Sequence, residues 1–199
     1  MSHHFDLAGE MAEARKALSP SDRAILAHYS VPEAMIERGM IGVVMADLSS
    51  GEALWATEGH SRLFVTPCLF IFEAETPEWE RAPFEGYPLD ILAWRPESPD
   101  WYFRIGNATW LGAYPPQFLD PEPVRVHDTP LSWLRSGGVG ICPLSHNPAE
   151  RQQLLLNIHI IAAADMEHAM ELRRLLERPM RIPKIVIEGG SEDVGGAAA

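Results

Sequence analysis

The spacing of hydrophobic residues changes along the 199-residue chain and divides it into regions of different predicted structure. Between residues 5 and 39, apolar side chains recur every three or four positions, which predicts three short amphipathic helices. Pro20 and Pro32 fit the first turns of the second and third helices, where proline is tolerated best. Because each helix has one apolar side, the three helices need another surface to cover them.

A β pattern follows from residue 40 to residue 106. Short runs of apolar and alternating residues are separated by turn-forming residues, which predicts an antiparallel meander with hairpins at 41–57 and 89–106. Between the hairpins lies an apolar stretch at 62–75, and we expect Pro67 to break it.

The C-terminal region has a strand, helix, strand, helix, strand pattern, preceded by a short helix that Thr129 is expected to cap. Its strand-like segments are continuous apolar runs, which are typical of a parallel sheet covered on both faces. The sequence therefore predicts an α+β fold with N-terminal helices, an antiparallel β meander and a small three-stranded parallel α/β lobe. The predicted regions are 1–39 (helical), 40–126 (antiparallel β), 127–188 (α/β, with strands at 139–144, 158–163 and 184–189) and 189–199 (a disordered tail).

The formal net charge is −12, and the negative charge is concentrated in the middle of the chain. Residues 70–130 contain eleven acidic residues against four arginines, together with aromatic side chains and many prolines. An acidic surface repels nucleic-acid phosphates and anionic membranes, so we expect no direct binding to either. No stretch is long and apolar enough for a membrane span, and we expect a cytoplasmic protein whose acidic middle region contacts a protein partner.

The strand predicted at 158–163 runs into Asp165 and Glu167 at the start of a helix. Open α/β sheets place their sites at this edge, so the two carboxylates are candidate catalytic residues and candidate ligands for a divalent cation. Asp165 is also well placed to cap the helix. A helical wheel places Glu167 on the polar side, opposite Leu172 and Leu176, where a solvated ion-pair ladder would explain it.

The segment IIAAADMEHAMELRRLL, within residues 158–178, resembles the acidic strand-to-helix segment of toprim domains, the Mg-binding folds of primases and topoisomerases. The family pattern is Asp-x-Asp followed by a small residue or glycine inside an amphipathic helix. Glu167 stands here in place of the second Asp, and Met170 in place of the glycine. The family also needs a glutamate after an earlier strand, whereas the strand at 139–144 is followed by Ser145 and His146.

A broader resemblance rests on DILAWRPESPDWYFRIGNATWLG and TPLSWLRSGGVGICPL. Together these segments are similar to uncharacterised bacterial proteins of prophages and other mobile elements, found near replication genes. The resemblance implies a setting in DNA metabolism and no assigned activity.

Three functional hypotheses follow from the sequence. We favour a non-catalytic accessory or interaction protein of a mobile genetic element. The second hypothesis is a Mg-dependent phosphoryl-transfer or nuclease-like enzyme, which needs a third carboxylate, such as Glu73 or Glu188, beside Asp165 and Glu167. The third is a small-ligand-binding α/β module that uses Ser145, His146 and Glu188 at the sheet edge. Magnesium is the only cofactor that the pattern suggests, and the sequence leaves the oligomeric state open.

Overall fold

The computed structural model describes residues 5–48, 53–57, 59–70, 87–112 and 122–179. Three helices open the chain, as predicted: α1 (Leu7–Lys16), α2 (Pro20–His28) and α3 (Glu33–Glu37). Asp6 caps α1 by accepting a hydrogen bond from the Gly9 amide, and Ser19 and Asp22 form a reciprocal capping box at α2. Local sequence thus determines where these helices begin.

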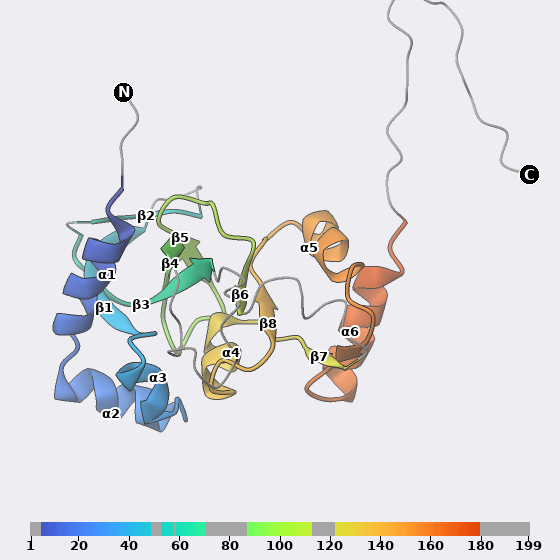
Figure 1. Ribbon diagram of the computed structural model, residues 1–199, viewed down its shortest axis with the longest axis horizontal. Helices are drawn as coiled ribbons and strands as arrows, with labels where there is room; N and C mark the ends of the chain where they lie inside the picture. The colour runs from blue at the N-terminus through green and yellow to red at the C-terminus, as the bar shows by residue number, and fades with distance from the viewer. Residues whose placement is uncertain (1–4, 49–52, 58, 71–86, 113–121, 180–199) are drawn as a thin grey trace, which may run out of the picture.

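A curled five-stranded antiparallel sheet follows the helices (Figure 1). Its spatial order is β2-β1-β3-β4-β5, and the antiparallel pairs β1-β2 and β4-β5 are the two predicted hairpins. The arrangement is not a simple meander, because β2 pairs with one edge of β1 and β3 with the other. The two outer edges meet where Leu54 bridges Phe103. The strands are β1 (Gly42–Leu48), β2 (Trp55–Thr57), β3 (Ser61–Phe70), β4 (Tyr87–Trp94) and β5 (Trp101–Phe103).

Two details of β3 depart from the expectation. Pro67 does not break the strand but pairs with Ile91 of β4, and the register shifts just after it. At its start, Ala46 of β1 pairs with residues of both β2 and β3, so the chain crosses β1 at Gly59. A β-carbon at Gly59 would lie 1.9 Å from the Ala46 carbonyl carbon, so only glycine fits this close approach.

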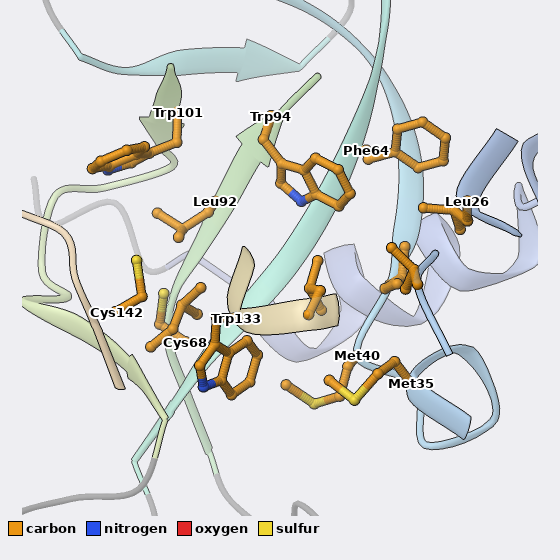
Figure 2. Packing of buried hydrophobic residues seen from close by; sticks show 14 of the residues in the cluster. Leu26, Met35, Met40, Phe64, Cys68, Leu92, Trp94, Trp101, Trp133 and Cys142 are labelled. Carbon is orange, nitrogen blue, oxygen red and sulfur yellow. The ribbon is translucent and has the colours of Figure 1, made fainter. Parts of the chain in front are cut away.

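The two faces of the curled sheet are covered by different helices. Helix α1 buries Leu7, Met11 and Ala14 against one face. The other face packs on α2, α3 and a later helix through a core that contains Trp94 and Phe64, whose rings stack with centroids 5.2 Å apart (Figure 2). The indole N–H of Trp94 donates to Thr66 Oγ1 at 2.9 Å, so this buried polar group is satisfied.

Asp90 of β4 is a fully buried carboxylate. Its Oδ1 accepts hydrogen bonds from the amides of Ile91, Arg104 and Ile105 at 2.8–3.1 Å. Its Oδ2 accepts from Asn107 at 2.7 Å and Ala108 at 3.4 Å. One side chain therefore organises the loop that leads from β5 to β6.

The C-terminal lobe is built from short strands and three helices (Figure 1). Strands β7 and β9 pair in parallel, while β8 pairs antiparallel with β6 and is joined to the β7 segment by one parallel bridge, Val126 to Ile141. The elements are β6 (Trp110–Gly112), β7 (Val124–Arg125), α4 (Pro130–Arg135), β8 (Ile141–Pro143), α5 (Pro148–Leu155), β9 (Ile161–Ala162) and α6 (Met166–Leu176).

The three-stranded parallel lobe predicted from sequence is not confirmed. The parallel sheet has two strands, and one of them, β7, lies at 124–125, which the sequence assigned to the antiparallel region. The strand expected at 139–144 shortens to β8 and pairs antiparallel, because Trp110–Gly112 occupies its other edge. The segment at 184–189 and the tail at 189–199 lie outside the described residues. None of the helices in the described ranges has the length and hydrophobicity that a membrane span requires.

Candidate functional site

The carboxyl ends of β7 and β9 lie on the same edge of their parallel sheet, and the bridge from Val126 to Ile141 brings the end of β8 to that edge. The residues that follow these strands include Asp128, His146 and Asp165. A pocket of about 190 Å³ opens here between the strand ends and helices α5 and α6. Side chains that line it include Asp128, His146, Arg151, Glu171, Leu172 and Arg178.

His168 of α6 lies against Asp128, one of the side chains that line the pocket. The His168 side chain is 5% exposed, and its Nε2 lies 3.0 Å from Asp128 Oδ1. Its Nδ1 accepts a hydrogen bond from the Ala164 amide at 3.1 Å, so in the neutral ring the proton is on Nε2. Despite the short distance, the contact with Asp128 lacks the alignment of a hydrogen bond, and Nε2 has no other partner among the described residues.

Arg151 of α5 reaches the same carboxylate from the other side. Its side chain is 25% exposed, and its Nη2 lies 3.9 Å from Asp128 Oδ1. The buried Nε has no acceptor among the described residues. A good guanidinium–carboxylate pair has distances of roughly 2.7–2.9 Å, so the mostly buried Arg151 has no well-matched partner within the part of the chain that the structure describes.

His146 forms the aromatic wall of the pocket. Its ring stacks on Trp101 of β5, with centroids 4.8 Å apart and an interplanar angle of 23°, and it meets Phe103 edge-on at 6.2 Å. The stacking places the imidazole between the curled sheet and the C-terminal lobe. The side chain also lines the pocket, as the sequence-based choice of His146 as a ligand-binding residue requires.

Ser145, predicted together with His146, has a different environment. Its Oγ donates to Glu150 Oε2 at 2.6 Å and accepts from the Asn147 amide at 3.1 Å. Asn147 caps α5 through the Ala149 amide. Ser145 therefore belongs to a capping network at the start of α5, with its hydroxyl proton directed to Glu150.

Asp165 is the N-cap of α6 and accepts the His168 amide at 2.9 Å, as expected for a strand-to-helix junction. Glu167 is exposed in the first turn of the same helix, where a negative charge is favourable. The described residues contain no group of three His, Cys, Asp or Glu side chains arranged to hold a metal ion. Glu73 and Glu188 lie outside the described residues.

His127 lies one residue before Asp128 and is buried. Burial lowers the pKa of its imidazole, an effect partly offset by the hydrogen-bonding contact between Nε2 and the Val139 carbonyl at 2.9 Å. The two thiols of the core, Cys68 and Cys142, are also buried, and desolvation raises the pKa of each well above the ordinary range. Neither thiol is therefore suited to act as a nucleophile.

Asp128, Arg151 and His168 were not predicted from the sequence as residues of the site. One pattern could have identified Asp128: the segment VRVHD is followed by Thr129 and Pro130, so an acidic residue stands between a short apolar strand and a capped helix, as at Asp165. Comparison with models of known protein families, with curated proteins and with solved structures found no match.

Proposed function

We propose that the protein is a small-ligand-binding module whose site is the pocket between the strand ends and helices α5 and α6. The observation that carries the proposal is Arg151, whose mostly buried side chain lines the pocket and whose buried Nε has no acceptor among the described residues. Burying a charged group whose ion pair with Asp128 is long is costly, and a bound ligand would offset that cost.

The composition of the pocket supports a small polar ligand. Charged residues from α5, from α6 and from two loops border it, and Pro148, Leu172 and Leu175 supply an apolar surface. Its volume of about 190 Å³ is below the roughly 300–1,000 Å³ of most sites for drug-sized molecules. We therefore expect a compact molecule, or one group of a larger molecule, to occupy it.

Binding explains the site better than catalysis does. His168 is held on one side by the Ala164 amide and faces Asp128 on the other. The hydroxyl of Ser145 is engaged in the cap of α5. These side chains leave no nucleophile beside a free general base among the described residues that border the pocket, and such a pair is the usual arrangement for covalent catalysis.

The experiment is an NMR titration of the ¹⁵N-labelled full chain with small compounds of different charge: inorganic phosphate, succinate, putrescine and glycine. We expect at least one compound to shift the amide resonances of Asp128, Arg151 and Glu171. Leu175→Trp, which fills the pocket, should abolish the shifts. The matched control is Leu156→Trp at an exposed leucine of the α5 C-cap, and it should retain them. If no compound shifts these resonances, the proposal is wrong.

A second candidate function, contact with a protein partner, is favoured by two exposed methionines on α6. Met166 is 75% exposed and Met170 is 47% exposed, and they are four residues apart on one side of the helix. Adaptable methionine surfaces are common at protein interfaces. The double variant Met166→Gln/Met170→Gln should fold normally, because both side chains are exposed, and should bind the partner more weakly. Sedimentation of the chain with its copurified partner measures this binding. Unchanged sedimentation of the complex in the double variant would contradict the second candidate function.

A further inference from the structure

We infer that the pocket binds its ligand through an oxyanion, a carboxylate or phosphate group held by Arg151 and Arg178. This inference rests on the proposed function and specifies the chemistry of the ligand. Both arginines line the pocket, Arg151 from α5 and Arg178 from the residues that follow α6.

The environment of Arg151 is the first step. A guanidinium offers five N–H donors in a planar fork that matches the two oxygens of a carboxylate or phosphate. Its ion pair within the described residues is with one Asp128 oxygen, 3.9 Å from Nη2 and beyond direct hydrogen-bond range, and its buried Nε has no acceptor there. Because the side chain is three-quarters buried, bulk water cannot satisfy the whole fork. An oxyanion is the chemical group that the arrangement lacks.

Asp128 does not fill this role, because His168 Nε2 and Arg151 Nη2 both face its Oδ1 and neither forms a well-aligned hydrogen bond with it. His168 Nε2 lies at 3.0 Å from that oxygen, closer than Arg151 does. Asp128, which also lines the pocket, instead partly neutralises Arg151 and leaves the rest of the fork for a ligand. The same contacts argue against an ammonium ligand at Asp128, since two cationic or N–H-bearing side chains already face the carboxylate.

Arg178 provides a second positive group. Its backbone is held by a hydrogen bond from Gln152 Nε2 to its carbonyl at 2.7 Å, and Gln152 follows Arg151 on α5. The two arginines are thus anchored to one another through α5. No ion pair of the Arg178 guanidinium is formed with the described residues. Two arginines that converge on a small pocket favour a group with several negatively charged oxygens.

Glu171 restricts which oxyanions fit. Its exposed carboxylate also lines the pocket, on α6 one helical turn from Leu175. It repels a second negative charge placed beside it. We therefore expect the ligand to carry its oxyanion toward Arg151 and a neutral or hydrogen-bond-donating part toward Glu171.

The test compares anionic and cationic probes on the intact chain and its variants by the NMR titration described above, at constant ionic strength in chloride. Inorganic phosphate, succinate or both should shift the pocket amides, and the comparison of the two identifies which oxyanion is preferred. Arg151→Gln and Arg178→Gln should each weaken binding by roughly tenfold or more, as expected for the loss of charged hydrogen bonds. Arg174→Gln, an exposed arginine of α6 that does not line the pocket, is the matched control and should bind normally.

The outcomes separate this inference from the proposed function. If putrescine shifts the pocket amides while phosphate and succinate do not, the pocket binds a ligand and the oxyanion inference is wrong. Equal anion binding by the wild type, Arg151→Gln and Arg178→Gln also overturns the inference. If none of the four compounds shifts these amides, both proposals fail. Arg178 is exposed, so its variant keeps the test valid even if Arg151→Gln does not fold.

Discussion

Replacing Asp90 with alanine should strongly destabilise the protein. The carboxylate is fully buried and accepts hydrogen bonds from five backbone amides, four of them at 2.7–3.1 Å and one at 3.4 Å. Asp90→Ala leaves these amides without their acceptor. The amides of buried Ile91 and Ala108 would also be shielded from water, whereas the amide of exposed Asn107 lies at the surface of the loop.

The expected magnitude follows from the buried amides. An unsatisfied buried donor costs about 1–3 kcal/mol, and hydrogen bonds to charged groups are worth about 1.5–3 kcal/mol. Since water can replace part of the loss at the exposed end of the loop, we expect a decrease of about 3–5 kcal/mol in the free energy of unfolding. A decrease of this size is a large part of the roughly 5–15 kcal/mol typical of a domain.

Urea denaturation followed by tryptophan fluorescence measures this change, because buried Trp94 and Trp101 report on the sheet that Asp90 organises. Asp90→Asn is an informative second variant: one oxygen remains, but the new NH₂ group faces amide donors, so we expect an intermediate loss. The control is Asp100→Ala, an exposed aspartate that accepts from Ser98 Oγ, with an expected effect within about 0.5 kcal/mol. A loss below about 1 kcal/mol for Asp90→Ala would refute the reasoning.

Three further predictions concern pH and metal. The pKa of Asp22 is lowered from 3.8 to about 2, chiefly by hydrogen bonds from Arg62, so the folded state favours the ionised carboxylate. The free energy of unfolding should fall as the pH drops from about 4 to about 2, by at most about 2 kcal/mol because Arg62 is half exposed. Acid denaturation curves of Asp22→Asn should lack this pH dependence. A variant curve identical to that of the wild type would contradict the prediction. The pKa of buried His127 is lowered, so the folded state favours the neutral imidazole. The protein should therefore lose stability as the pH falls below 6.5, the ordinary pKa of histidine, and His127→Gln should flatten the plot of melting temperature against pH in that range. Because Asp165 caps α6, Asp165→Ala should cost about 1 kcal/mol, and millimolar Mg²⁺ should leave the melting temperature of the wild type unchanged. A Mg²⁺-dependent rise that disappears in Asp165→Ala would instead support the metal site.

Features that depend on a few neighbouring residues were predicted well. The three N-terminal helices, the two hairpins and the cap of α4 by Thr129 all match the structure, because caps, turn residues and hydrophobic spacing act within one element. The same is true of Asp165 as the N-cap of α6 and of Glu167 on its exposed side.

The sequence alone therefore determined much of the secondary structure of the described residues, and it predicted a candidate site at a sheet edge near residue 165. Tertiary structure decided which strands form that edge, because a two-residue strand such as Val124–Arg125 is too short for a recognisable hydrophobic period. Its parallel pairing with Ile161–Ala162 brings together segments more than thirty residues apart and places Asp128 beside His168 and Arg151. Such convergence depends on long-range packing, so the pocket and its unmatched arginine become visible only in the folded protein.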